Sequence, residues 1–264
     1  MSGRMPIALT IAGSDPSGGA GIQADLKTFH QFGVYGEAVI ATVTVQNTAR
    51  VEHVESLSPE LVIRQIRAVL DDIPPAAAKT GALGSAEIVR AVAELARGFT
   101  FSLVVDPVMI SKHGALLIAE DARRALYDEL LPWAALVTPN LHEAAALSGL
   151  EVSDVDGMRR AAERIAAAGA KAVLVKGGHL AGTAVDVLFS GGQWFEFSAE
   201  RVSTRHTHGT GCAYSAAITA GLALGCPLPE AVRRAKLWIT EAIRTAPGLG
   251  AGAGPINHFA AVAP

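Results

Sequence analysis

Short apolar runs alternate with longer segments of helical periodicity along almost the whole chain, and this alternation restricts the possible folds most strongly. Runs such as Pro6 to Ala12, Ala38 to Val45 and Phe101 to Val105 are apolar and β-prone, which is typical of buried strands. Ser58 stands before a proline, as a helix N-cap does, and apolar residues then follow along one helical face. Because strand–helix units recur without a linker, we predict one α/β domain over residues 1–264, with a mostly parallel sheet and helices on both faces.

The remaining predicted elements continue this order. The other strands are Val51 to Leu57 (exposed), Ala76 to Thr80, Ala135 to Thr138, Ala172 to Val175, and a hairpin of Val185 to Phe189 with Trp194 to Phe197. The helices run from Ile22 to near Gly33, from Pro59 to Leu70, from Ser85 to Arg97, from Ala119 to about Leu131, from about Asp156 to Ala168, from the turn at Cys212 to about Leu224, and from Pro229 to Thr245.

Composition and charge exclude several classes of protein. Half of the residues are hydrophobic and 18% are charged, which allows a sizeable core. The net charge of −3, without a basic run, argues against nucleic acid and anionic membranes as partners. No apolar run approaches the roughly 18 residues that span a bilayer, the N-terminal apolar stretch is too short for a signal peptide, and Cys212 and Cys226 form no disulfide framework. We therefore expect a cytoplasmic protein with small-molecule partners.

Polar residues and glycines gather where the predicted strands end. In an open parallel sheet, ligands bind beyond the carboxyl ends of the strands. The residues found there are Gly13-Ser14-Asp15, Gln46-Asn47, Lys79-Thr80-Gly81, Asp106, Asn140 and Lys176-Gly177-Gly178. The pattern predicts one site to which many strand ends contribute.

The turn before Cys212 carries the strongest chemical signal. The chain narrows to Gly209, Thr210 and Gly211 and then continues as a helix of small apolar residues. A glycine-rich turn at a helix N-terminus presents unpaired N–H groups and the positive end of the helix dipole to an anion. Cys212 lies in the first helical turn, so we expect a lowered thiol pKa and a stabilised thiolate. The alternative is a plain cap that ends a loop and starts a helix.

Two acids and a lysine at strand ends add further parts of a phosphoryl-transfer site. Asp106 and Glu143 are carboxylates of the kind that hold Mg²⁺. Asn140 and Glu143, three residues apart, equally fit a capping box, and the two roles are compatible. Lys176, before two glycines, either reaches a phosphate or is an ordinary solvated lysine. With Cys212 near the acceptor hydroxyl, the set favours a Mg²⁺-dependent kinase.

Better-known nucleotide and metal motifs are not satisfied. Gly19 to Ala24 fits G-x-G-x-x-A, but it lies several residues beyond the predicted strand, whereas a dinucleotide fingerprint occupies the first turn after it. The chain has no Gly-Lys pair and therefore no P-loop. His206 and His208 lack the spacing of a zinc site. Nucleotide phosphates must therefore be held by another arrangement.

Several motifs together are specific enough to suggest a family. They are Ala12 to Lys27, Gln46 to Thr48, Asp106 to Met109, Thr138 to Ala144, Val175 to His179, Thr207 to Cys212 and Gly254 to His258. With them, nearly the whole chain resembles the hydroxymethylpyrimidine and hydroxymethylpyrimidine-phosphate kinases of thiamine biosynthesis, in the ribokinase-like superfamily. The resemblance implies a three-layer α/β/α ribokinase-like fold with a mostly parallel central sheet, and a homodimer. It also implies phosphorylation of 4-amino-5-hydroxymethyl-2-methylpyrimidine, then of its monophosphate, with ATP and Mg²⁺ as cofactors.

The resemblance further implies roles for individual residues. The residues that would line the pyrimidine pocket are Gln46, Gly13, Ala20 and Val108, with Asp25 near the phosphate end of the substrate. Those that would hold Mg²⁺ are Asp106 and Glu143, and those on the nucleotide side are Asn140, Lys176 and Thr207. The anion hole would comprise Gly209, Thr210, Gly211 and Cys212, with Cys212 where many ribokinase-like sugar kinases carry an aspartate base.

Two departures from the family pattern bear on the substrate. Ala82 stands where relatives commonly carry a methionine over the pyrimidine, and the tail from Gly250 to Gly254 has alanines where relatives often have Lys or His. A pyridoxine or pyridoxal kinase is the nearest alternative, because related enzymes with the same glycine–cysteine turn accept vitamin B6. A binding module without catalysis is the other alternative, and the presence of both acids, Lys176 and Cys212 argues against it.

Overall fold

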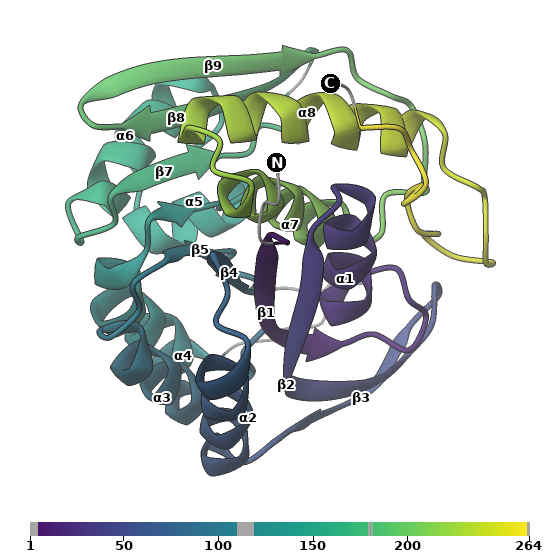
Figure 1. The fold of residues 1–264 in the computed structure, drawn as a ribbon. Helices are drawn as coiled ribbons and strands as arrows, with labels where there is room; N and C mark the ends of the chain where they lie inside the picture. Colours follow the sequence, from purple (N-terminus) through teal and green to yellow (C-terminus); the bar gives the residue numbers. More distant parts are fainter. Residues whose placement is uncertain (1–4, 110–118, 179, 181, 263–264) are drawn as a thin grey trace.

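The computed structural model describes residues 5–109, 119–178, 180 and 182–262 (Figure 1). His179, the last residue of one of the family motifs, lies outside the described residues. The strands that the structure describes form one sheet in the order β3-β2-β1-β4-β5-β6-β7-β8-β9. No helix among the described residues is long and apolar enough to cross a membrane.

Six neighbouring strands in the middle of the sheet are parallel. They are β2 (Tyr35–Gln46), β1 (Ile7–Ser14), β4 (Ala77–Thr80), β5 (Ser102–Val105), β6 (Leu136–Val137) and β7 (Ala172–Val175). Antiparallel strands lie at the two edges: β3 (Val51–Ser56) beside β2, and the hairpin of β8 (Ala184–Ser190) and β9 (Gln193–Ala199) beside β7. Because six carboxyl ends meet along one edge, the residues that follow them are brought together.

Helices cover both faces of this sheet. One face carries α1 (Gly21–Gln31), α7 (Thr210–Ala223) and α8 (Leu228–Arg244); the other carries α2 (Pro59–Asp72), α3 (Ala86–Ala96), α4 (Glu120–Ala125), α5 (Leu141–Ser148) and α6 (Val155–Ala166). Side chains alternate between the two layers, so Leu9 and Ile11 pack into one apolar cluster and Ala8 into the other. The expected three-layer α/β/α fold with a mostly parallel sheet is confirmed.

The predicted helix from Ala119 to Leu131 is the main local difference. Only Glu120–Ala125 is α-helical; a π-helical turn, Leu126–Leu130, and a 3₁₀ turn, Leu131–Trp133, follow. Pro132 has no N–H and its ring crowds the preceding turn, so regular α-helical bonding cannot continue past it. The N-cap predicted at Ser58 is confirmed, because its hydroxyl accepts the Leu61 N–H at 3.2 Å.

Candidate active site

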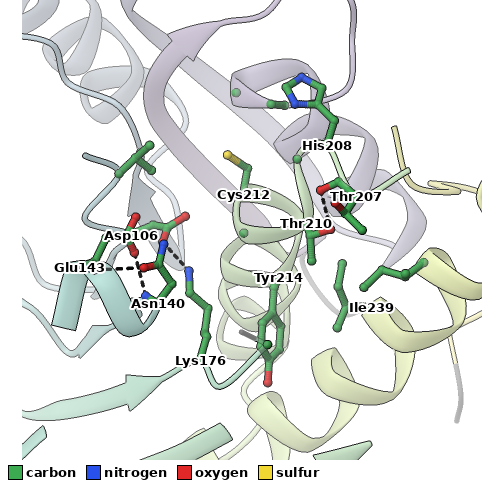
Figure 2. A pocket seen from close by; sticks show the side chains of 18 of the residues that line it. Asp106, Asn140, Glu143, Lys176, Thr207, His208, Thr210, Cys212, Tyr214 and Ile239 are labelled. Atoms are coloured by element: carbon green, nitrogen blue, oxygen red, sulfur yellow. Dashed lines mark hydrogen bonds and ion pairs between the residues drawn. The ribbon is translucent and has the colours of Figure 1, made fainter. Parts of the chain in front are cut away.

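A cavity of about 800 Å³ lies at the carboxyl ends of the parallel strands (Figure 2). Thirteen of the fourteen residues expected to form the site border it, and only Asp25 does not. The thirteen are Gly13, Ala20, Gln46, Asp106, Val108, Asn140, Glu143, Lys176, Thr207, Gly209, Thr210, Gly211 and Cys212. The structure thus brings together residues that are far apart in the sequence.

The turn at the start of α7 forms one wall of this cavity. Gly209 has a left-handed backbone with φ of 76°, and a Cβ there would lie 1.7 Å from the Gly19 carbonyl oxygen, so only glycine fits. The Thr210 hydroxyl donates to the Thr207 carbonyl at 2.8 Å, and no side chain caps the helix. Since the first N–H groups of a helix have no partner within it, the turn is suited to bind an anion.

The protonation state expected for Cys212 is wrong. Burial raises the pKa of the Cys212 thiol to about 11, and the charge of Lys79 opposes this shift only in part. The carboxylates of Asp25 and Asp106 repel a thiolate and raise the pKa further. The favourable field of the helix N-terminus is thus outweighed by the loss of solvation, and Cys212 is a thiol at neutral pH.

Asp106 and Lys176 form a buried ion pair next to the turn. Asp106 accepts hydrogen bonds from Lys176 Nζ at 2.9 Å, Thr138 Oγ1 at 3.0 Å and Ser215 Oγ at 3.1 Å. Burial by itself lowers the pKa of Lys176, but the charges of Asp106 and Glu143 more than compensate and raise it. Lys176 therefore stays charged and is not an ordinary solvated lysine.

Glu143 lies beside this pair and also caps α5. Its Oε2 accepts the Asn140 N–H at 2.7 Å, and the Asn140 side chain accepts the Glu143 N–H at 3.0 Å, so the predicted capping box is confirmed. Burial raises the pKa of Glu143 to about 7, the Lys176 charge lowers it and the Asp106 charge raises it. The cap and a place in the cavity lining coexist in this residue.

Asp25 is fully buried and does not border the cavity. Its expected place near the phosphate end of the substrate stays a prediction. Its Oδ2 accepts from Lys79 Nζ at 2.8 Å and from Thr10 Oγ1 at 2.6 Å, and both members of the ion pair are 0% exposed. Thr10 and Lys79 are register partners in β1 and β4, so both side chains reach α1 from the same face of the sheet. Asp25 thus neutralises a lysine within the core.

One protein family matches nearly the whole chain. The model described as phosphomethylpyrimidine kinase matches residues 15–257. The chain belongs to the phosphomethylpyrimidine kinase family. A hydroxymethylpyrimidine/phosphomethylpyrimidine kinase of Rhizobium meliloti is 51% identical over 257 residues, which are 96% of this chain and 97% of the relative. One of Streptomyces coelicolor is 49% identical over 253 residues, or 96% and 94% of the two chains.

Solved structures of related kinases have the same fold. A Bacillus subtilis pyridoxal kinase in complex with ADP superimposes with a TM-score of 0.91 at 40% identity, over 97% of this chain and 98% of that one. A Clostridium difficile phosphomethylpyrimidine kinase gives a TM-score of 0.81 at 46% identity, over 91% of this chain and 100% of that one. The family match thus extends to the three-layer architecture.

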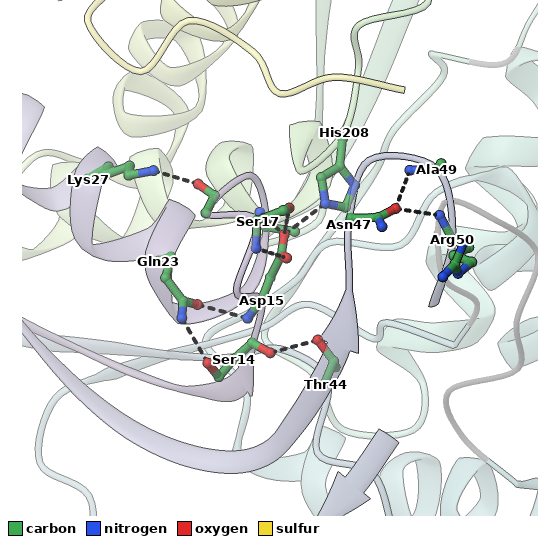
Figure 3. A network of polar contacts seen from close by, with 12 residues as sticks. Ser14, Asp15, Ser17, Gln23, Lys27, Thr44, Asn47, Ala49, Arg50 and His208 are labelled. Carbon is green, nitrogen blue, oxygen red and sulfur yellow. Dashed lines mark hydrogen bonds and ion pairs between the residues drawn. The ribbon is translucent and has the colours of Figure 1, made fainter. Parts of the chain in front are cut away.

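A polar network in this member of the phosphomethylpyrimidine kinase family was not anticipated from its sequence (Figure 3). Asp15 accepts hydrogen bonds from the Ser17 and Ala20 N–H groups and pairs with His208 Nε2, each at 2.8 Å. Burial raises the pKa of Asp15, but the hydrogen bonds of His208 and Ser17 outweigh it and hold the pKa well below its usual range. Asp15 thereby ties the loop between β1 and α1 to the residue that precedes Gly209. The sequence Asp-Pro-Ser was the available signal, since Asp commonly accepts from the N–H two residues on.

Proposed function

We propose that this member of the phosphomethylpyrimidine kinase family transfers the γ-phosphoryl group of ATP to the hydroxymethyl group of 4-amino-5-hydroxymethyl-2-methylpyrimidine, and then phosphorylates the resulting monophosphate. One observation carries the proposal: the anion-binding turn adjoins the Lys176–Asp106 pair in a single cavity. A Cβ on Gly211 would lie 3.6 Å from Lys176 Nζ and 4.0 Å from Asp106 Oδ2. Phosphoryl transfer requires N–H donors, a cation and a metal-binding carboxylate within a few ångströms of one another.

The pyrimidine half of the cavity is assigned to the ends of β1 and β2. Gln46 borders the cavity, and its side-chain amide is able both to donate to and accept from an aminopyrimidine edge. Gly13, Ala20 and Val108 supply small or apolar surface for the ring. Ala82 borders the same cavity and leaves more space than the methionine common in relatives.

The charges of Asp106 and Glu143 fit a divalent cation. The Asp106 charge raises the pKa of Glu143, which means that two buried carboxylates repel each other in this part of the cavity. Mg²⁺ is often held by one or two carboxylates, with waters and phosphate oxygens completing the shell. Within the described residues no group of three or more His, Cys, Asp or Glu side chains surrounds one point, so the remaining ligands would come from water and nucleotide. When bound, Mg²⁺ neutralises charge on the transferred phosphoryl group.

Lys176 and the turn at α7 are assigned to the phosphates, with Asn140 and Thr207 on the nucleotide side. Cys212 is assigned to the substrate hydroxyl. With a thiol pKa of about 11, the thiolate fraction is on the order of 10⁻⁴ at pH 7. Cys212 therefore contacts the hydroxyl mainly as a thiol, and a loose transition state does not require early loss of the hydroxyl proton.

Steady-state kinetics with three acceptors test the proposal. The pyrimidine, its monophosphate and pyridoxal are each supplied with ATP and Mg²⁺, and ADP release is measured. We expect turnover of both pyrimidines and a lower kcat/KM for pyridoxal. Faster turnover of pyridoxal would instead favour the vitamin B6 kinase, a comparison that the close structural likeness to the Bacillus subtilis pyridoxal kinase makes necessary. If no acceptor causes ADP release, the protein is a binding module without catalysis, and the proposal is wrong.

A further inference from the structure

A further buried carboxylate, Asp186 on β8, borders the cavity and has no role in the proposed phosphoryl transfer. Asp186 is 2% exposed, and it borders the cavity together with Tyr214 and Lys236. Near them the lining becomes apolar, with Ile239 and Ile243 of α8. Lys176, Tyr214 and Ile239 surround the same cavity in Figure 2.

The Asp186 carboxylate accepts three hydrogen bonds from three different elements. Its Oδ1 accepts the Gly177 N–H at 2.9 Å, and its Oδ2 accepts from Tyr214 Oη at 3.0 Å and from Lys236 Nζ at 2.7 Å. Burial, followed by the Asp186 charge, raises the pKa of Tyr214 well above its ordinary value, so the phenol stays protonated and donates. The carboxylate thus joins the turn after β7 to α7 and to α8.

Both anchored segments lead directly to groups assigned to phosphate. Gly177 follows Lys176, and Tyr214 follows Cys212 by two residues on α7. The Lys176 N–H donates to the carbonyl of Pro139, which follows β6, at 2.8 Å, so the backbone of this lysine is fixed on one side by that segment and on the other through Gly177. The turn lies close against β8, because a Cβ on Gly177 would collide with the Val185 carbonyl oxygen, so only glycine fits there.

We propose that Asp186 is a positioning residue for the nucleotide: its buried carboxylate holds the Lys176–Gly177 turn, α7 and α8 as one unit, so that the Lys176 ammonium and the anion-binding turn stay at the separation that a nucleoside di- or triphosphate requires. The inference rests on the proposed function. Its effect should fall mainly on nucleotide binding, because β1, β4, β5, β6 and β7 lie between β8 and the strand that carries Gln46.

The decisive variant is Asp186→Asn, which keeps the size of the side chain and an acceptor for the Gly177 N–H but removes the charge opposite Lys236. ADP affinity is measured by calorimetry in the presence of Mg²⁺, and KM values are measured for ATP and for the pyrimidine. We expect roughly tenfold weaker ADP binding, because Lys176 and the anion-binding turn are no longer held in place before the nucleotide binds. We also expect a matching rise in KM for ATP and a KM for the pyrimidine within about twofold of wild type. Tyr214→Phe, which removes one donor and no charge, should give a smaller change in the same direction.

Glu196→Gln is the matched control, because it breaks the exposed Arg159–Glu196 pair (2.7 Å) on the neighbouring strand β9 and should leave ADP affinity unchanged. If Asp186→Asn does not fold, the double variant Asp186→Asn/Lys236→Met, which leaves no unpaired charge, replaces it in the same comparison. A folded variant with wild-type ADP affinity, or with equal losses for both substrates, would overturn the proposal. Wild-type protein that binds no ADP would contradict the proposed function itself.

Discussion

Cys212 should react with iodoacetamide far more slowly than an ordinary thiol, although it lies at a helix N-terminus beside two lysines. Its pKa is raised from 9.0 to about 11, chiefly by burial. At any pH well below both values, this shift of about two units leaves roughly a hundredfold less thiolate than an unperturbed cysteine has, and the thiolate is the reactive form. The alkylation rate should therefore climb about tenfold for each pH unit through neutral and mildly alkaline pH, without a plateau below pH 9.

Removing the charge of Asp25 should shift the pKa of Cys212 in the opposite direction, that is, downward. Because the Asp25 carboxylate raises the pKa of Cys212, Asp25→Asn should lower that pKa and speed alkylation at a fixed pH of 8. Lys79 retains an amide oxygen as acceptor in this variant, so the core pair is weakened rather than removed. Asp25 does not border the cavity, which separates the electrostatic effect from a change in access.

Peptide mass spectrometry after timed alkylation gives the rate at Cys212 alone, and a Cys226→Ser background removes the other thiol. The shape of the pH profile is the readout, since partial burial slows alkylation at every pH by a similar factor. A plateau at or below pH 8.5 would refute the argument that burial outweighs the helix field. If the pH profile of alkylation is the same in Asp25→Asn as in wild type, the Asp25 charge does not raise the pKa of Cys212, and that part of the argument is refuted.

Three further predictions concern the buried pair, the metal-binding acid and the substrate amide. Lys79→Met should lower stability by about 3–5 kcal/mol, because it leaves Asp25 buried without its partner, and the melting temperature should fall by roughly 10 °C; Lys79→Met with Asp25→Leu should recover part of that loss. Because the pKa of Glu143 is raised to about 7, protonation of Glu143 should weaken Mg²⁺ binding below pH 7. The Mg²⁺ concentration for half-maximal activity should therefore rise as the pH falls, and Glu143→Gln should remove this pH dependence. Gln46→Ala should weaken pyrimidine binding by about 1–3 kcal/mol while the KM for ATP stays constant.

The fold and most of the candidate site follow from patterns that are local in the sequence. Short apolar runs mark the strands. Because parallel strands have their carboxyl ends at one edge of the sheet, the residues that follow these runs lie close together. The sequence therefore predicts that Asp106, Asn140 and Lys176 share one site, and all three border the cavity. A π-helical turn before Pro132 was not predicted, because the same periodicity fits an α-helix.

Protonation states were not accessible in the same way, because they depend on a balance of large opposing contributions. The position of Cys212 in a first helical turn was correct, but the sign of its pKa shift was wrong. A helix terminus stabilises an anion by about 0.3–1 kcal/mol at exposed sites, whereas a shift of one pKa unit corresponds to about 1.4 kcal/mol. Burial, which the spacing of residues does not reveal, therefore decides the outcome.

Three lysines of the site region pair with aspartates that lie far away in the sequence. Lys79 and Lys236 are buried, and the Lys176 side chain is 12% exposed. Each is paired with an aspartate, at a separation along the chain of 54 residues for Lys79, 70 for Lys176 and 50 for Lys236. No local rule connects residues so far apart. Yet Lys79 stands inside a run that was predicted to be a buried strand, and a buried ammonium group without a carboxylate partner is prohibitively costly. That conflict alone requires an acidic partner from another element. Asp25 is that partner, and it lies on α1, which packs against β1, the neighbour of β4 in the sheet.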